Sequence, residues 1–302
     1  MITQAATTLV TEDKVSVALW KVTDSIATAT SQRRDVFMTH GTFSDRRICL
    51  GFAGYLAAHG CTCWILEWRG HGSSQKQVAP FDFETVALFD VKAALTYLVE
   101  EEGVRRLDCV THSGGGLALT MCLLRNPYLI ERIARIALFA CQACHAAVSS
   151  WQHLRLRCLK TASRLAGNLP GKRLGIGVQD ESYFMMRQWF DWNLQRRFSG
   201  HDGFDYLAHM PRVAAPVLAV FGGRDPLIAP PQACRSYLAA FRNDANLAMH
   251  CAVSNGFSQD YDHARVLHSS AAKSEIWPAT RTWLELRPPS FAAAGGSTAG
   301  RQ

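Results

Sequence analysis

The sequence lacks the long apolar runs and the leading basic segment that would direct a chain into or across a membrane. No stretch approaches the roughly 18 to 20 uninterrupted apolar residues that span a bilayer. The first 25 residues carry Glu12, Asp13 and Asp24 and contain no basic cluster followed by an apolar core, so we expect no secretion signal. Together with the many cysteines described below, these absences predict a cytoplasmic protein.

Acidic residues are in the minority, but the basic excess is not gathered into a nucleic-acid-binding pattern. The 302 residues include 32 Lys and Arg against 25 Asp and Glu, a formal net charge of +7. No basic run, zinc knuckle or RNA-binding signature accompanies this charge, so we expect no nucleic-acid partner. With 48% hydrophobic and 19% charged residues, the chain can bury a sizeable core, which excludes disordered and fibrous folds.

Ten cysteines are present, yet a second metal-binding pair is missing. Cys141 and Cys144 have redox or zinc spacing, but no further pair of Cys or His lies nearby. A four-ligand site needs such a second pair, so we predict no metal, and no motif calls for a cofactor. Most of the cysteines lie in apolar segments, which favours reduced thiols packed in a core.

Short apolar runs alternate with stretches of helical spacing along most of the chain. Strands are predicted at residues 14–22, 25–30, 35–39, 61–68, 107–111, 133–140, 216–221 and 246–253. Helices are predicted at residues 46–59, 83–101, 117–125, 231–241 and 271–286. Such alternation implies crossover connections, so we predict an α/β fold with a mostly parallel sheet flanked by helices.

The alternation stops between residues 147 and 212, where aromatic, methionine and basic residues are broken by Gly and Pro. We interpret residues 147–212 as a helical cap inserted into an α/β core made of residues 1–146 and 213–288. Residues 289–302 are rich in Ala, Gly and Ser, a composition that predicts a disordered tail.

The most informative segment is Thr111-His112-Ser113-Gly114-Gly115-Gly116, between a predicted strand and a predicted helix. A serine on such a sharp turn is lifted above the carboxyl edge of the sheet, and small neighbours let strand and helix approach closely. Gly114 and Gly115 meet that demand, although Thr111 stands where Gly is usual. A phosphate loop or a plain turn is the alternative, but the Lys-Ser/Thr ending of a nucleotide loop is missing. Ser113 is therefore the candidate nucleophile.

A serine nucleophile needs a base and a group that orients the base, and both are expected at downstream loops. Asp225 follows the predicted strand at residues 216–221 and suits the orienting role, although it could also be a turn residue before Pro. His263 lies between the last predicted strand and the last helix and is the candidate base. His268 and His250 are its rivals, and we expect His250, inside a predicted strand, to pack in the core.

The order Ser113, Asp225, His263 resembles the α/β-hydrolase superfamily, as do His40-Gly41-Thr42-Phe43 and Trp68-Arg69-Gly70-His71-Gly72-Ser73 after two predicted strands. The resemblance covers residues 35–286. Tyr261-x-His263 followed by Trp277-Pro278 is similar to the acid-lipase-like and uncharacterised bacterial hydrolase branches. The implied fold is the α/β-hydrolase fold with an inserted helical cap. The implied oxyanion hole consists of the backbone N–H groups of Thr42 and Gly114. His40 is expected to shape its loop by hydrogen bonding, and residues 69–73 to form a structural turn.

Residues 151–212 contain ten basic and five acidic side chains, which supply +5 of the net charge of +7. A basic cap suggests an anionic substrate, such as an acyl thioester of a phosphorylated carrier, or peripheral contact with an anionic membrane; a solvated helical face is the alternative. We predict that Phe43, Met186 and Trp189 bind the substrate. The cap's aromatic residues could equally form its own small core.

The leading hypothesis is a serine hydrolase, esterase or lipase-like, that cleaves carboxylic esters through an acyl-enzyme. A thioesterase or an acyltransferase would use the same residues. The hypothesis from another class is a non-catalytic ligand-binding protein on the same fold. The expected partner is a small acyl ester or thioester, and the sequence carries no indication of oligomeric state.

Overall fold

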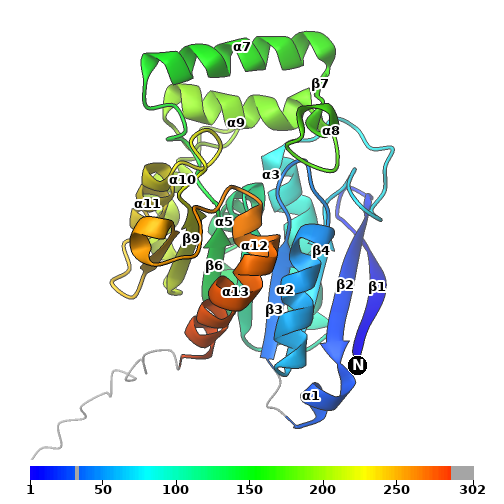
Figure 1. The fold of residues 1–302 in the computed structure, drawn as a ribbon. Helices are drawn as coiled ribbons and strands as arrows, with labels where there is room; N and C mark the ends of the chain where they lie inside the picture. The colour runs from blue at the N-terminus through cyan, green and yellow to red at the C-terminus, as the bar shows by residue number, and fades with distance from the viewer. Residues whose placement is uncertain (31–33, 287–302) are drawn as a thin grey trace, which may run out of the picture.

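The computed structural model describes residues 1–30 and 34–286. Its centre is an eight-stranded sheet in the order β1-β2-β4-β3-β5-β6-β9-β10 (Figure 1). The strands are β1 (Ile2–Val10), β2 (Ser16–Asp24), β3 (Arg34–Thr39), β4 (Cys61–Glu67), β5 (Leu107–His112), β6 (Ile133–Phe139), β9 (Val217–Gly222) and β10 (Leu247–Cys251). β2 pairs antiparallel with β1 and β4, and every other neighbouring pair is parallel. The predicted mostly parallel α/β sheet is confirmed.

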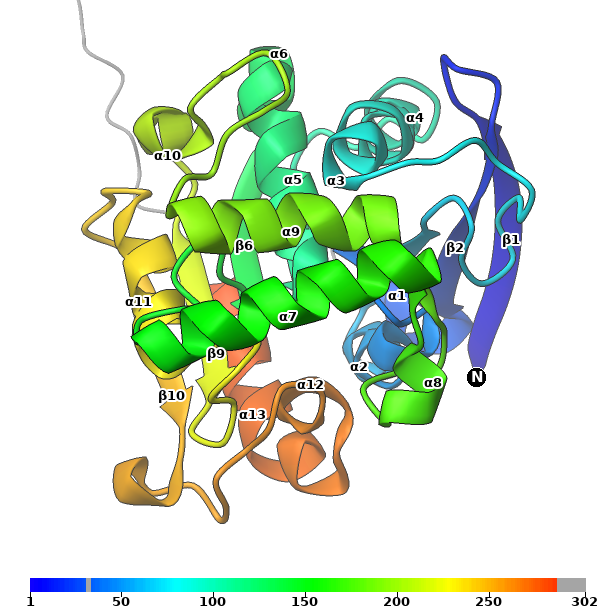
Figure 2. The same cartoon turned by 90° about the horizontal axis from the view of Figure 1, so that it is seen from above.

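Helices cover both faces of this sheet (Figure 2). One face carries α2 (Arg47–Ala58), α12 (Arg265–His268) and α13 (Ser270–Glu285). The other carries α3 (Phe83–Thr85), the π-helical turn η1 (Val86–Val91), α4 (Lys92–Glu100), α5 (Gly114–Arg125) and α6 (Pro127–Ile130). The short helix α10 (Tyr206–His209) leads through η2 (Met210–Arg212) into β9, and α11 (Pro231–Ala239) connects β9 to β10, with η3 (Val253–Asn255) beyond.

The central strands have continuous apolar sequences rather than alternating ones because both of their faces are buried. Every residue of β4, β5 and β9 is buried, because helices cover both faces of these strands. Helix α5 is buried from Gly114 to Leu124, so it is apolar on all sides rather than amphipathic. The core therefore lies around β5 and α5, on either side of Ser113.

One N-terminal prediction needs correction, and one N-terminal strand was not predicted. Residues 25–30, predicted as a weak strand, form the helix α1 (Ser25–Thr30). The Asp24 carboxylate accepts hydrogen bonds from the backbone N–H groups of Ile26 and Ala27, and this local capping outweighs the weak alternation. Strand β1 was not predicted, because all but one of its residues are at least partly exposed and it is held by its pairing with β2 rather than by burial.

The region predicted as a cap contains α7 (Ser150–Ala166), β7 (Asn168–Leu169), α8 (Gly171–Leu174), β8 (Glu181–Ser182) and α9 (Tyr183–Gln195), here called the α7–α9 segment. α9 lies across the carboxyl edge of the sheet and α7 lies outside α9 (Figures 1 and 2). Ser149 and Gln152 form a capping box at the start of α7, and Gly167 ends the helix with a positive φ. The division into core and cap stays a prediction, and the predicted tail at 289–302 lies outside the described residues.

No helix in the described part of the chain is long and apolar enough to cross a membrane.

Candidate active site

Ser113 stands at the sharp turn between β5 and α5. Its backbone has φ 52° and ψ −124°, a conformation that residues with a side chain rarely adopt. Ser113 N–H donates to Phe139 O at 2.7 Å, and Gly116 N–H donates to Ser113 O at 3.0 Å. The residue as a whole is 9% exposed. These contacts hold the hydroxyl at the carboxyl edge of the sheet, as the sequence predicts.

The glycines after Ser113 are required by close packing. A Cβ at Gly115 would lie 2.5 Å from His40 O, and one at Gly114 would lie 2.6 Å from Phe83 Cε1. Neither contact is sterically allowed, so only glycine lets α5 begin this close to β3 and α3. Thr111 stands at the position where glycine is usual, and the structure accommodates its side chain in a fully buried position.

His263 lies between Ser113 and Asp225 and is within hydrogen-bond distance of both. His263 Nε2 is 2.9 Å from Ser113 Oγ, and His263 Nδ1 is 2.6 Å from Asp225 Oδ2. A carboxylate can only accept, so Nδ1 carries the proton and Nε2 is free to accept from the serine hydroxyl. Burial by itself would raise the pKa of Asp225, but the charge and hydrogen bond of His263 outweigh it, and the pKa lies below its usual value. The structure thus brings together three side chains from three separate loops.

Neither rival histidine is bonded to Ser113. His250 is only half-buried and stacks on Phe221 with ring centroids 5.3 Å apart. The expectation that it packs fully in the core is wrong, because β10 is the edge strand of the sheet. His268 is exposed at the end of α12.

His112, a buried histidine that was not singled out from the sequence, supports His263. His112 Nε2 is 2.9 Å from the backbone O of His263, to which it can only donate. Burial, followed by the charge of His263, lowers the pKa of His112 to about 3, so its ring is neutral. His112 therefore fixes the backbone of His263. The position of His112, directly before Ser113, is the one sequence feature that could have pointed to this role.

The turn at residues 40–43 lies directly against Ser113. A Cβ at Gly41 would lie 2.7 Å from Ser113 Cβ and 2.9 Å from Gly114 N, which no substituted residue could tolerate. The backbone N–H groups of Thr42 and Gly114 have no hydrogen-bond acceptor among the described residues. Both candidate oxyanion donors are therefore available to a bound group.

His40 holds this turn by hydrogen bonds. Its Nδ1 is 2.7 Å from Gly41 O, and its Nε2 accepts from Trp68 N–H at 3.2 Å. Burial, followed by the charge of His71, lowers the pKa of His40 to about 3. His40 is thus a neutral loop-shaping residue, which agrees with the expectation from the sequence.

Phe43 connects the same turn to the α7–α9 segment. Its backbone N–H donates to Glu181 Oε2 at 3.2 Å, and its carbonyl accepts from Val178 N–H at 2.8 Å. The ring is buried against α8, where a Cβ at Gly171 would lie 2.5 Å from Phe43 Cδ1. Its substrate-binding role remains a prediction.

Glu181 binds a second residue that the sequence placed in a structural turn. His71 Nε2 lies 3.0 Å from Glu181 Oε2, and both side chains are buried. Burial lowers the pKa of His71, but the charge and hydrogen bond of Glu181 outweigh it and raise the pKa above its usual value. No sequence signal connects these residues, because 110 positions separate them.

Met186 and Trp189 are both buried on α9. The neighbouring Gln188 accepts a hydrogen bond from Glu84 N–H at 3.2 Å, which fixes α9 to α3. The predicted contact of Met186 and Trp189 with substrate remains a prediction.

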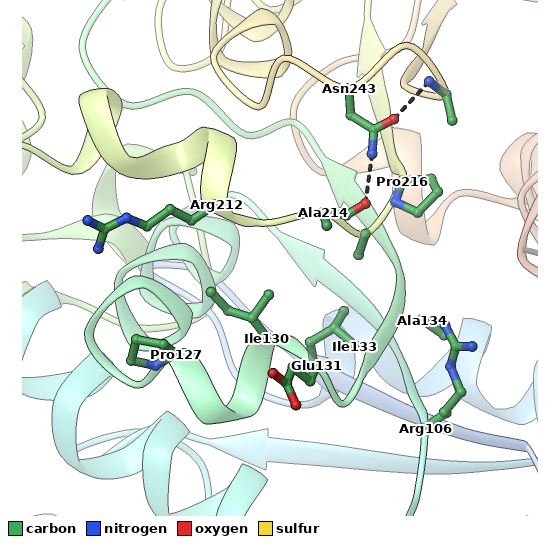
Figure 3. A pocket seen from close by; sticks show the side chains of 12 residues that line it. Arg106, Pro127, Ile130, Glu131, Ile133, Ala134, Arg212, Ala214, Pro216 and Asn243 are labelled. Atoms are coloured by element: carbon green, nitrogen blue, oxygen red, sulfur yellow. Dashed lines mark hydrogen bonds between the residues drawn. The ribbon is translucent and has the colours of Figure 1, made fainter. Parts of the chain in front are cut away.

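Two other features lie outside this site. Among residues 1–30 and 34–286, no three His, Cys, Asp or Glu side chains are grouped to hold a metal ion. A cavity of about 730 Å³ opens at the opposite edge of the sheet, where β6 and β9 begin (Figure 3). Its lining includes Arg106, Ile130, Glu131, Pro216 and Asn243.

Comparisons with known proteins agree with this architecture. Residues 30–184 match the family model described as serine aminopeptidase, S33. No curated protein has a sequence that matches this chain. An esterase from Exiguobacterium antarcticum superposes with a TM-score of 0.67 at 11% identity, covering 93% of this chain and 100% of that one.

Two further solved structures are similar at 16% identity, each covering 93% of this chain and 98% of its own. They are a thermophilic esterase from Thermogutta terrifontis, with a TM-score of 0.61, and a hydrolase from Pseudomonas aeruginosa PA01, with a TM-score of 0.62. These likenesses show the α/β-hydrolase fold. Because the family model also matches just over half of the sequence, the chain belongs to the serine aminopeptidase S33 family of α/β hydrolases.

Proposed function

We propose that the protein is a serine hydrolase of carboxylic esters. The observation that carries this proposal is the hydrogen-bonded series Ser113 Oγ, His263 Nε2 and Nδ1, and Asp225 Oδ2, with separations of 2.9 and 2.6 Å. A serine hydroxyl is a weak nucleophile until a neighbouring base accepts its proton, and His263 lies where that base is needed.

The reaction follows from these positions. Ser113 Oγ attacks the ester carbonyl carbon while His263 takes the hydroxyl proton and passes it to the leaving alcohol. Water, deprotonated by His263, then attacks the acyl carbon; the bond to Ser113 Oγ breaks, His263 returns the proton to that oxygen, and the acid is released. Asp225 keeps the proton on Nδ1 throughout and stabilises the imidazolium. The Thr42 and Gly114 N–H groups donate to the developing oxyanion, and one such donor contributes roughly 3 kcal/mol.

Esters are the favoured substrate class because the similar structures from Thermogutta terrifontis and Exiguobacterium antarcticum are esterases. The matched family carries an aminopeptidase description, so peptide-like amides are the second candidate. Thioester hydrolysis and acyl transfer to an alcohol use the same residues. A series of p-nitrophenyl esters, acyl thioesters and aminoacyl p-nitroanilides separates these activities by kcat/KM. The ester proposal requires the highest value for an oxygen ester.

A fluorophosphonate probe tests the nucleophile without knowledge of the natural substrate. We expect labelling of Ser113, located by mass spectrometry, in the wild type and in the matched variant Ser236→Ala on α11. Labelling should disappear in Ser113→Ala and fall steeply in His263→Ala. Absence of labelling in folded wild-type protein would contradict the proposal and favour a non-catalytic ligand-binding protein.

A further inference from the structure

Helix α7 presents large apolar side chains to solvent. It is the outermost element beyond the carboxyl edge of the sheet (Figures 1 and 2). Trp151, Leu154 and Leu165 are 70%, 52% and 84% exposed. With the exposed Cys158 they recur at intervals that place them on one side of a helix. An apolar stripe therefore runs along the outer side of α7.

This stripe is separate from the side by which α7 packs on the protein. Leu156 and Ser163 are almost fully buried on the inner side. Lys160, beside them, forms an ion pair with Asp191 of α9. The inner contacts already hold α7 in place, so the fold does not require an apolar outer side.

The exposed apolar residues are concentrated in this part of the molecule. Of the sixteen exposed large apolar side chains among the described residues, eight lie between residues 148 and 184. Leu174, at the end of α8, and Ile176 and Val178, just after it, belong to this group, and α8 lies beside the C-terminal end of α7. Single exposed apolar residues are ordinary, but a gathered set marks an interaction surface.

The charges around the stripe have one sign. Residues 150–178 contain six basic and no acidic side chains. Arg155, Arg157 and Arg164 are all exposed. At 100° per residue, Arg155 borders one side of the stripe, and Arg157 and Arg164 border the other. The first acidic residue after this region is Asp180, whose carboxylate accepts from Lys172 N–H.

We propose that the α7 face, defined as Trp151, Leu154, Cys158 and Leu165 with the three bordering arginines, docks onto an anionic lipid surface. The apolar stripe would enter the headgroup boundary while the arginines contact lipid phosphates, and tryptophan is favoured at that depth. A second copy of the chain is a poor occupant, because pairing two α7 faces would oppose arginines to arginines without an acidic partner on either helix. Charge complementarity therefore selects an anionic bilayer.

The α7 face lies on the same side of the molecule as Ser113, but the proposed lipid binding does not depend on the proposed ester hydrolysis. The α7–α9 segment crosses the edge of the sheet at which Ser113 lies. A docked molecule would present this edge to the lipid. Binding to vesicles requires no reaction at Ser113, so a failure of lipid binding and a failure of ester hydrolysis are measured separately.

Vesicle co-sedimentation tests the charge. We expect the wild type to bind phosphatidylcholine vesicles that contain phosphatidylglycerol, to bind pure phosphatidylcholine weakly, and to dissociate as salt rises. The triple variant R155Q/R157Q/R164Q should partition roughly 100-fold more weakly, since each basic residue near an anionic surface contributes about fivefold. The matched control R105Q/R106Q/R132Q loses the same net charge from exposed positions elsewhere and should bind like the wild type.

The apolar contribution needs its own pair of variants. W151S/L154S/L165S should lose vesicle binding, whereas Y128S/L247S/V253S, which removes exposed apolar residues outside the α7 face, should keep it. Circular dichroism and thermal unfolding verify that all variants are folded. Equal losses in the test and control variants, or no binding by the wild type, would overturn the proposal.

Cys158 allows a measurement at the stripe itself. It is the exposed cysteine of the ten, so a nitroxide reagent should label it selectively in the native protein. On anionic vesicles we expect the label to become accessible to dissolved oxygen and protected from a water-soluble nickel complex. A label that stays in water on bound vesicles would contradict docking through α7. Concentration-dependent spin–spin broadening without vesicles would assign the stripe to a second copy instead.

Discussion

At the scale of single residues, burial separates the histidines around Ser113 into different roles. His40 and His112 are fully enclosed, so their pKa values fall to about 3 and both rings stay neutral. Among the histidines that the structure describes, only His263 lies within hydrogen-bond distance of both Ser113 Oγ and a carboxylate. The sequence could nominate Ser113, Asp225 and His263 because residues after parallel strands converge at one edge. It could not show that His112 holds His263, since that contact spans 151 positions.

The orienting role of Asp225 predicts a selective loss of catalysis. In Asp225→Asn the geometry is conserved, but the amide no longer fixes the proton on His263 Nδ1, so we expect kcat for an ester substrate to fall by roughly 10⁴. KM should change little, because Asp225 lies behind the base. Steady-state kinetics on a p-nitrophenyl ester measures both values. Asp244→Asn, an exposed carboxylate, is the control; a kcat within tenfold of wild type for Asp225→Asn would remove this residue from the mechanism.

At the scale of elements, the α7–α9 segment and the turn at residues 40–43 are bound to each other. Glu181 on β8 accepts from Phe43 N–H and contacts His71, while Phe43 O accepts from Gln179 N–H. The sequence located the strands and helices that these loops connect, because apolar periodicity is local. It predicted residues 69–73 as a structural turn but could not supply the contact of His71 with Glu181, because that carboxylate comes from a segment far along the chain.

The Glu181–His71 pair predicts a pH dependence of stability. His71 Nδ1 faces Arg69 O and Nε2 faces Glu181, so both ring nitrogens meet acceptors and the imidazolium is favoured. Burial and, to a smaller extent, the charge of Lys76 lower the pKa of His71, but Glu181 and Arg69 O outweigh them, so this pKa is raised on folding. A group with a raised pKa contributes its full stability below its unfolded pKa, about 6.5, and loses it as pH rises through the folded value.

We therefore expect Glu181→Gln to lower the free energy of unfolding most below about pH 6.5 and progressively less above the raised pKa of His71. Urea unfolding of the wild type and the variant across neutral pH measures this difference. Glu101→Gln, at an exposed position, should show a small difference that does not follow the same course. A constant difference for Glu181→Gln at all pH values would contradict a charged His71.

At the scale of the whole molecule, most of the cysteines belong to the hydrophobic core. Nine of the ten are buried and one, Cys158, is exposed. Burial raises the pKa of the Cys141 thiol to about 12, and this thiol lies 3.0 Å from Ser113 O, to which it donates. Cys141 and Cys144, which are spaced like metal ligands, are therefore protonated residues of the hydrophobic core.

Thiol reactivity should consequently report on global unfolding. We expect Ellman's reagent to modify one thiol rapidly in the native protein and ten in denaturant, because the thiolate is the reactive form and burial disfavours it. Cys158→Ser should abolish the rapid phase, and the number of thiols that react in denaturant should fall from ten to nine. Rapid modification of several thiols in the native state would show that the core opens locally.

The sequence by itself determined the sharp turn at Ser113, most strands and helices, and the order of the candidate triad. Each of these depends on glycine geometry, apolar periodicity or chain order, which are local properties. Only the tertiary structure decided that Glu181 holds Phe43 and His71, and that α7 keeps a second apolar side exposed. Those features depend on which distant surfaces meet: 138 residues separate Phe43 from Glu181, and the periodicity of α7 cannot tell a buried side from an open one.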